Sequence, residues 1–217
     1  MDETLPMATV RTQVTVPLRF PDGYVTTARV HSFHGLVDGR EHLAFAFGER
    51  AAAGAGQAPD APPPLVRPHS ECLTGDVFGS QRCDCGPQLR EAVERIAEAG
   101  GYLLYLRQEG RGIGLYAKLD AYALQDGGLD TYEANVALGR GADERDYTVA
   151  AQMLAALGVT RVALLSNNPD KADQLDRLGV TVVDRVPTGV HLFPANADYL
   201  AAKVARADHA LHLPFVS

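Results

Sequence analysis

Residues 102–106 (YLLYL) and the glycine-rich segment after them constrain the fold of this chain more than any other feature of its sequence. An apolar run of this length is typical of a buried strand, and the polar sequence RQEGRGIG directly after it predicts a loop. Helical spacing then predicts a helix over residues 115–125. Because α/β proteins bind ligands where a strand gives way to a loop and a helix, we expect an α/β fold with a binding loop near its middle.

Strands and helices alternate through the rest of the C-terminal two-thirds. Helical spacing predicts helices over residues 88–99, 144–157 and 169–178, and short apolar runs predict strands over 65–69, 162–165 and 180–183. Nearer the N-terminus, alternating polar and apolar residues predict antiparallel strands over 10–16, 24–30 and 42–47. The expected fold class is therefore α/β, with a mixed sheet of N-terminal antiparallel strands and C-terminal alternating strands and helices.

Two segments stand apart from this pattern. Residues 48–64 (GERAAAGAGQAPDAPPP) are rich in Ala, Gly and Pro and lack large apolar side chains, which predicts an exposed, flexible loop. Near the C-terminus, helical spacing over 195–207 predicts a final helix that packs as a cover, followed by a tail over 208–217. Because the loop is short for a linker between domains, we expect a single domain over residues 1–217.

Composition and charge exclude several classes of protein. Hydrophobic residues make up 46% of the 217 residues, which is too many for a disordered chain. The formal net charge of −7 argues against a protein that coats nucleic acid. The acidic N-terminus lacks a signal pattern, and no stretch approaches the roughly 18 apolar residues of a membrane span. We therefore expect a cytoplasmic protein whose partners include neither nucleic acid nor membrane.

Three cysteines lie close together, in the sequences HSECLTGD (69–76) and RCDCG (82–86). Their odd number excludes a closed set of disulfides, and in a reducing compartment this spacing favours a metal site. Zn²⁺ prefers thiolates in tetrahedral geometry, and three protein ligands with water as the fourth form a catalytic site that activates the water. Two alternatives stay open, namely three buried thiols without a metal and a structural four-ligand site completed by a histidine. The candidate histidines are His69, His31, His34 and His42.

Several arginines flank the cysteines and residues 102–106, namely Arg67, Arg82, Arg107 and Arg111. Guanidinium binds phosphate through two hydrogen bonds, so these residues suggest a phosphate-bearing substrate; solvated surface arginines are the alternative. Glycines in residues 110–114 resemble a phosphate-binding loop but lack the Lys-Ser or Lys-Thr of a P-loop. Glu109 could accept hydrogen bonds from the edge of a guanine base, or it could cap a loop or helix.

Polar residues at two predicted helix starts have both structural and functional interpretations. Residues 143–146 (DERD) open the predicted helix 144–157, where acidic side chains serve as caps. The sequence SNNP (166–169) predicts an N-cap with proline in the first turn. Because this cap follows a strand, Ser166 and Lys171 could also contact phosphate. Tyr122 lies at helical spacing from Leu115 and Leu119, so a core tyrosine is its default interpretation.

Six motifs in order along the chain closely resemble GTP cyclohydrolase II. They are HSECLTGD (69–76), RCDCG (82–86), RQEGRGIGL (107–115), AYALQD (121–126), DERDY (143–147) and SNNP (166–169). The resemblance covers residues 65–187 strongly and the N-terminal strands loosely.

The resemblance implies the first step of riboflavin biosynthesis, in which GTP is hydrolysed to 2,5-diamino-6-(5-phosphoribosylamino)pyrimidin-4(3H)-one with release of formate and pyrophosphate. One zinc ion per subunit would be held by the cysteines that match the family, Cys72, Cys83 and Cys85. Asp143 matches the family's proton acceptor, Arg145 the nucleophile toward the α-phosphorus, and Tyr122 a tyrosine at the catalytic centre. Because guanidinium stays protonated, Arg145 would stabilise departing pyrophosphate without any unusual environment.

The resemblance also implies a set of GTP contacts and partners. The contacts fall on Arg67, Pro68, His69, Ser70, Glu71, Gln88, Glu109, Gly110, Arg111, Thr131, Ser166 and Lys171. Pro68 stands where a small aliphatic residue is common, which removes a backbone donor, and Ser166 stands where Thr is common and keeps the hydroxyl. Mg²⁺ is expected with the triphosphate, and a homodimer is typical of the family. The companion synthase domain often fused to the family is not expected in the 65 residues before the motifs.

Two other functions are compatible with the same residues. A specialised paralogue could stop at the formamidopyrimidine or serve a secondary pathway, although the presence of Tyr122, Asp143 and all three cysteines argues against early arrest. A zinc-stabilised nucleotide-binding module without turnover is an alternative from a different class.

Overall fold

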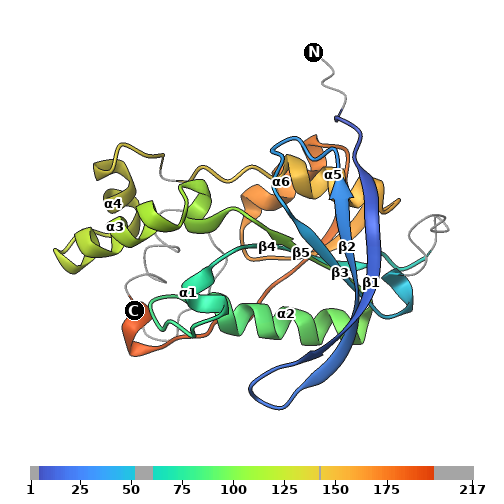
Figure 1. Ribbon diagram of the computed structural model, residues 1–217, viewed down its shortest axis with the longest axis horizontal. Helices are drawn as coiled ribbons and strands as arrows, with labels where there is room; N and C mark the ends of the chain where they lie inside the picture. Colours follow the sequence, from blue (N-terminus) through green and yellow to red (C-terminus); the bar gives the residue numbers. More distant parts are fainter. Residues whose placement is uncertain (1–4, 52–60, 142, 198–217) are drawn as a thin grey trace.

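The computed structural model describes residues 5–51, 61–141 and 143–197 of the chain. Its strands form one mixed seven-stranded sheet in the order β1-β2-β3-β5-β4-β6-β7. The bounds, in that order, are β1 (Thr9–Arg19), β2 (Val25–His34), β3 (Leu43–Phe47), β5 (Gly101–Leu106), β4 (Leu65–Ser70), β6 (Arg161–Leu165) and β7 (Thr181–Val186). Figure 1 shows β1 and β2 as a long hairpin at one side of the molecule.

Strand β5 joins the antiparallel and parallel parts of the sheet. It pairs antiparallel with β3, which continues the antiparallel series β1, β2, β3. On its other side it pairs parallel with β4, and the parallel pairing continues from β4 to β6 and from β6 to β7. The carboxyl ends of β5, β4, β6 and β7 therefore meet at one edge of the sheet. This architecture confirms the mixed α/β fold predicted from the sequence.

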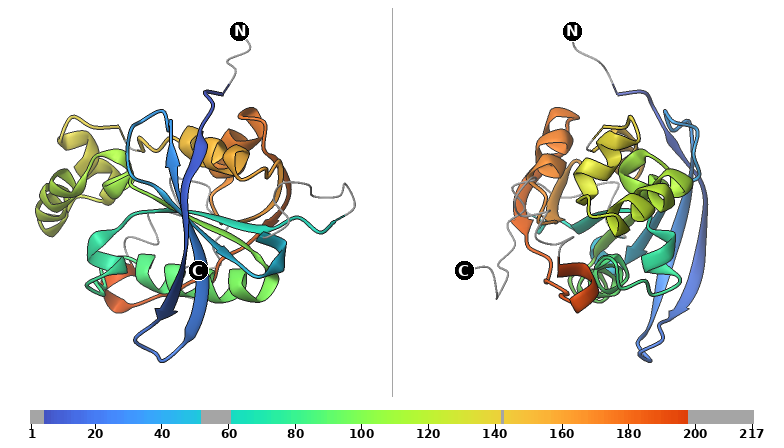
Figure 2. Two further views of the ribbon diagram at one scale, coloured as in Figure 1. Left: turned by 45° about the vertical axis from the view of Figure 1, so that its right-hand side comes forward. Right: turned by 90° about the vertical axis from the view of Figure 1, so that its left-hand side faces the viewer.

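Helices cover both faces of the sheet. Helix α2 (Cys85–Ala99) lies along one face, and α5 (Thr148–Ala156) and α6 (Pro169–Arg177) lie on the opposite side (Figures 1 and 2). Helix α3 (Leu115–Asp126) packs against α4 (Thr131–Ala137), and this pair projects beyond the strands. The remaining helical turns are α1 (Leu73–Asp76) and the 3₁₀ turns Glu49–Ala51, Glu109–Gly112 and Pro194–Asn196.

Two hydrophobic clusters, one on each face, hold the layers together. Successive side chains of a strand point to opposite faces, and in β5 Leu103 packs with Ile96 of α2 while Leu104 packs with Leu154 of α5. Both faces of β5 are buried. This double burial explains why residues 102–106 are a continuous apolar run rather than an alternating one.

The structure corrects several predicted elements. The helix predicted over residues 144–157 begins only at Thr148, because residues 143–147 form an irregular segment whose Glu144 N–H donates to the carbonyl of Arg111. Helices α1 and α4 were not predicted. The segment predicted as an exposed loop over 48–64 includes the 3₁₀ turn Glu49–Ala51, in which Ala51 is buried and its carbonyl accepts a hydrogen bond from Tyr102 Oη. Residues 52–60, most of the predicted helix 195–207 and the tail 208–217 lie outside the described residues.

Candidate active site

A single pocket collects most of the residues predicted to be functional. It lies at the carboxyl ends of the parallel strands, where α/β proteins bind ligands, and its volume is about 1100 Å³ including the part open to solvent. The predicted site residues that line it are Arg67, His69, Ser70, Glu71, Cys72, Cys83, Cys85, Gln88, Glu109, Gly110, Arg111, Tyr122, Thr131, Arg145, Ser166 and Lys171.

Two predicted site residues, Pro68 and Asp143, lie outside the set that lines the pocket but touch residues within it. The carbonyl of Pro68 accepts a hydrogen bond from Lys171 Nζ at 2.8 Å. Asp143 Oδ1 accepts from Arg145 Nε at 2.8 Å, and Asp143 Oδ2 accepts from Arg145 Nη2. Both residues therefore position a cationic side chain of the pocket.

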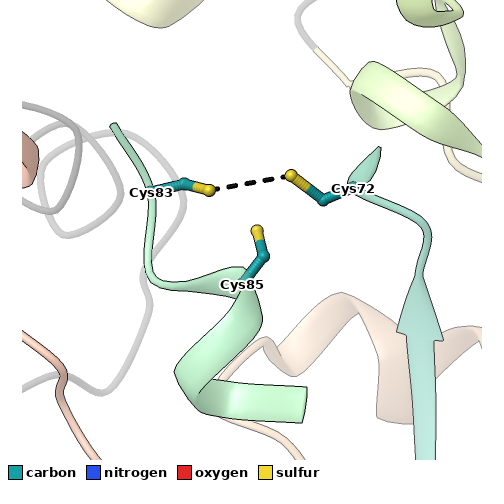
Figure 3. Close-up of side chains that lie close together, drawn as sticks. All are labelled: Cys72, Cys83 and Cys85. Carbon is teal, nitrogen blue, oxygen red and sulfur yellow. Dashed lines mark hydrogen bonds between the residues drawn. The ribbon is translucent and has the colours of Figure 1, made fainter. Parts of the chain in front are cut away.

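The three cysteine sulfurs converge from two segments of the chain, one just after β4 and one at the start of α2 (Figure 3). Cys72 follows β4, Cys83 lies in the loop before α2, and Cys85 is the first residue of α2. All three sulfurs lie within 4.8 Å of one another, and those of Cys72 and Cys83 are 3.6 Å apart. A tetrahedral zinc with Zn–S bonds of about 2.3 Å separates its sulfurs by roughly 3.8 Å. The geometry and donor set of the cysteines therefore fit zinc.

Hydrogen bonding among the thiols makes them unequal. Because Cys72 Sγ accepts hydrogen bonds from the thiols of Cys83 and Cys85, the pKa of Cys72 falls well below its ordinary value, and the Lys118 ammonium lowers it further. The same hydrogen bond raises the pKa of Cys83 to about 11, and the pKa of Cys85 also rises. Among the three thiols, Cys72 is therefore the one whose surroundings most favour the thiolate form.

Two glycines, Gly75 and Gly86, make this convergence possible. A Cβ on Gly75 would lie 2.9 Å from Cys83 Sγ and 3.1 Å from Cys72 Sγ. A Cβ on Gly86 would lie 2.5 Å from the carbonyl oxygen of Gly75. These positions have room for a hydrogen atom but not for a methyl group. Sequence reasoning missed Gly75, and the glycine of the motif TGD is the signal that could have pointed to this packing.

Among the residues that the structure describes, no histidine belongs to the group of three cysteines. His69 is buried, and its Nε2 lies 3.2 Å from Asp76, whose carboxylate also accepts from Cys72 N and from Tyr105 Oη. Burial lowers the pKa of His69, so the ring is neutral near neutral pH. His69 thus supports the backbone of Cys72 through Asp76, and the four-ligand site considered from the sequence finds no support here.

Arg67 connects the end of β6 to the segment that holds Cys83 and Cys85. It is buried, which excludes the surface interpretation for this arginine, and its Nη1 donates to the carbonyl of Leu165 at 3.0 Å. Its Nη2 donates to Gln88 Oε1 at 2.8 Å, and Gln88 Nε2 donates to Asp84 at 2.6 Å. Asp84 stands between Cys83 and Cys85, so this chain of hydrogen bonds fixes the orientation of the Gln88 amide beside the cysteines.

The other predicted arginines differ in their positions. Arg111 lines the pocket from a left-handed backbone conformation (φ 60°), which is strained for a side chain larger than glycine. Arg107 pairs with Glu71 at 2.9 Å, and Arg82 pairs with Asp126 while its guanidinium lies 4.6 Å from the Tyr122 ring centroid. Arg107 and Arg82 fall outside the described lining set.

Helix α6 follows shortly after the end of β6, and it begins with the N-cap that the sequence predicted. Asn168 Oδ1 accepts from the Asp170 N–H at 3.0 Å, Pro169 occupies the first turn, and Ser166 Oγ accepts from the Asn168 N–H. This N-cap prediction is confirmed. Asn167, which was not singled out, donates from Nδ2 to Thr188 Oγ1 at 2.8 Å and so ties the end of β6 to the segment after β7.

Tyr122 and Asp143 have pKa values displaced in opposite directions. Burial raises the pKa of Tyr122, so this phenol is protonated near neutral pH. Burial alone would raise the pKa of Asp143 as well, but the ion pair with Arg145 outweighs it and the pKa falls below the ordinary value of 3.8. One group at this site therefore holds a proton while the other is ionised.

Other residues that line the pocket were not predicted as site residues. They are Ile113, Lys118, Ala121, Gln125, Asn135, Asn167, Asn168 and Thr188. None of the helices in the described part of the chain has the length and hydrophobicity that a membrane span requires. Together the fold and the pocket define an α/β ligand-binding protein, with cationic side chains and a metal-compatible group of three thiols at the carboxyl ends of its parallel strands.

Comparison with known proteins identifies the family. A model of the GTP cyclohydrolase II family matches residues 12–187. GTP cyclohydrolase-2 of Vibrio cholerae is 53% identical over 186 residues, which cover 86% of this chain and 90% of that protein. GTP cyclohydrolase-2 of Psychromonas ingrahamii is 46% identical over 213 residues, covering 96% of this chain and all of that protein. The chain belongs to the GTP cyclohydrolase II family.

A longer relative also matches most of this chain. Riboflavin biosynthesis protein RibBA of Bacillus velezensis is 51% identical over 187 residues, which cover 86% of this chain and 45% of that protein. The family predicted from six short motifs is therefore confirmed.

Proposed function

We propose that this enzyme hydrolyses GTP to 2,5-diamino-6-(5-phosphoribosylamino)pyrimidin-4(3H)-one, with release of formate and pyrophosphate, as the first step of riboflavin biosynthesis. The observation that carries the proposal is the placement of three converging sulfurs in one pocket with Arg67, Arg111 and Lys171. A metal-compatible group next to cationic side chains suits an enzyme that opens a base ring and cleaves a phosphoanhydride bond. The names of the relatives support the same substrate and pathway.

Cys72, Cys83 and Cys85 would hold one zinc ion per subunit. When bound, zinc supplies a Lewis acid that makes water nucleophilic near neutral pH, as attack on C8 of guanine requires. Gln88, whose amide is fixed by Arg67 and Asp84, stands beside the cysteines as a contact for the base. Glu109 already accepts three protein N–H groups, so one acceptor position of its carboxylate is left for the base.

The triphosphate would lie toward the cationic side of the pocket. Arg111, Arg145 and Lys171 are the cations we assign to it, and Ser166 lies next to the N-terminus of α6, where anions are favoured. Mg²⁺ would accompany the phosphate oxygens. Thr131 at the start of α4, with residues 67–71 at the end of β4 and just after it, completes the proposed contacts with GTP.

We assign the proton transfers to Tyr122 and Asp143. The protonated phenol of Tyr122 lines the pocket and can donate a hydrogen bond to the reacting base. The ionised carboxylate of Asp143 is available as a proton acceptor once Arg145 turns toward the phosphates. Arg145 would then stabilise the charge on departing pyrophosphate.

Mass spectrometry of the products, with a parallel formate assay, tests this function. Zinc-loaded protein is incubated with GTP and Mg²⁺, and we expect the diaminopyrimidine monophosphate with stoichiometric formate. A monophosphate that retains the formamide would instead identify a paralogue arrested after ring opening. Unchanged GTP would replace the proposal with a nucleotide-binding module.

Replacement of Asp143 separates catalysis from binding. We expect Asp143→Asn to abolish turnover while zinc content stays at the wild-type value. Asp146→Asn is the matched control, because Asp146 caps Thr148 N at 2.6 Å and an asparagine can do the same. Full activity in Asp143→Asn would refute its assigned role. The homodimer implied by the family stays a prediction, which light scattering in solution can decide.

A further inference from the structure

Lys118 of α3 places a buried ammonium group directly against one sulfur of the cysteine group. Lys118 Nζ lies 3.1 Å from Cys72 Sγ, 3.0 Å from Thr74 Oγ1 and 2.8 Å from Glu109 Oε1. An ammonium has three N–H donors, so these three contacts use all of them. The residue is 8% exposed, and its position is therefore determined by protein contacts rather than by solvent.

Glu109 holds this ammonium in place. Its Oε1 also accepts from the Gly110 N–H at 2.9 Å, and its Oε2 accepts from the Leu73 N–H at 2.7 Å. The carboxylate thus connects the turn after β5, the start of α1 and helix α3. Gly110 permits the close approach, because a Cβ there would lie 3.1 Å from Lys118 Cβ.

We infer that Lys118 is a positioning residue for the metal centre, which donates an N–H···S hydrogen bond to the Cys72 thiolate and withdraws charge from that ligand. Hydrogen bonds to coordinating atoms orient ligands and tune the metal that they hold. Lys118 and Glu109 have opposite charges, so their pair adds no net charge, and the directed hydrogen bond to sulfur carries the effect. With less charge donated by Cys72, the metal is a stronger electrophile.

The alternative is an ordinary buried ion pair that only supports the fold. Removing either partner from such a pair leaves an unpaired buried charge, and both single variants would then be destabilised in similar ways. The inferred role predicts an asymmetry instead. Loss of Lys118 changes the electronic state of the metal-bound sulfur, whereas loss of the Glu109 charge alone leaves the N–H···S donor present.

Cobalt(II) substitution provides a readout that is independent of turnover. We expect one cobalt per chain in the wild-type protein, with a sulfur-to-cobalt charge-transfer band in the near ultraviolet. Lys118→Met should shift this band to lower energy, because a thiolate without its hydrogen bond gives up charge more easily. Turnover of GTP by the zinc form should fall by about 10- to 100-fold. Glu109→Gln should leave the band near its wild-type position.

Two further variants complete the test. The double variant Lys118→Met with Glu109→Gln removes both charges together, and it decides the question if the single Lys118 variant does not fold. It should show the same shift as Lys118→Met. Lys171→Met removes another buried pocket cation, whose Nζ donates to the Pro68 carbonyl, and should not move the band.

The outcomes separate this inference from the proposed function on which it rests. Wild-type protein that binds no cobalt through sulfur would overturn the metal site and this inference together. A wild-type band that stays in place in both variants lacking Lys118, or that moves equally in Glu109→Gln or Lys171→Met, would overturn the role of Lys118 alone.

Discussion

Gly75 offers a direct test of how tightly the protein is packed around the three sulfurs. The glycine is buried in α1, and its φ lies outside the left-handed range, so alanine is acceptable to the backbone itself. The added methyl group would nevertheless lie 2.9 Å from Cys83 Sγ, 3.1 Å from Cys72 Sγ and 3.2 Å from Cys85 Cβ. Ordinary contacts of a Cβ begin near 3.4 Å. The substitution therefore forces the cysteines apart.

The magnitude of the effect follows from this overlap. Overpacking by one methyl group in a well-packed region costs about 1–3 kcal/mol. The metal-free cysteines can relax away from the methyl group, whereas cysteines bound to zinc are held at fixed separations, so the cost falls mainly on the metal-bound state. At about 1.4 kcal/mol per factor of ten, zinc affinity should fall by roughly 5- to 150-fold.

Competition with a chelator of known affinity measures this change. Gly127→Ala is the control, because Gly127 also has a negative φ (−85°) and its Cβ would meet only the backbone near Leu124 at 3.2 Å or beyond. We expect Gly75→Ala to keep its helical circular dichroism while losing zinc to the chelator earlier than Gly127→Ala and wild type. Equal zinc affinity in all three proteins would refute the argument that Gly75 sets the spacing of the sulfurs.

Three further predictions concern the metal, the core and pH. Cys83→Ser should lose zinc, measured by elemental analysis, together with formate release; a zinc-free variant that still releases formate would contradict the metal assignment. Leu164→Ala, at a fully buried position of β6, should lower the free energy of unfolding by about 2–5 kcal/mol in urea denaturation. Partial burial raises the pKa of Glu91, but the Gly189 N–H, His191 and Arg95 outweigh it and the pKa falls below 4.5. Its stabilising contribution is therefore present above pH 4.5 and is lost as the pH falls through the lower folded value. Glu91→Gln should be less stable than wild type near neutral pH, with a difference that narrows in acid; a constant difference would contradict this.

The predicted strands and the cysteine motif illustrate what local sequence information can settle. Residues 102–106 form a buried strand because their side chains must be apolar on both faces, and that requirement is visible in five consecutive letters. The N-cap at Asn168 is equally local, since its side chain bonds an amide two residues away. The three cysteines were recognisable as a group because few residues separate them.

Residues 143–147 show where local information fails. Their acidic side chains are typical of a helix start, yet they remain irregular because Glu144 bonds the backbone of Arg111 and Asp143 is held by Arg145. The bond to Arg111 joins segments more than 30 residues apart. A local pattern cannot contain that contact, so the sequence predicted the helix several residues too early.

The sequence by itself determined the family, the α/β class and the identity of most pocket residues. This was possible because apolar periodicity and short motifs involve only residues that are close together in the sequence. Only the tertiary structure decided that Gly75 packs against the sulfurs and that His69 hydrogen-bonds Asp76. The same holds for the hydrogen bond from Lys118 to Cys72, which lies 46 residues away in the sequence. A lysine in a helix and a glycine in a short turn are ordinary in isolation. Their roles arise from distances between segments, which folding establishes through the packing of α1, α2 and α3 at one edge of the sheet.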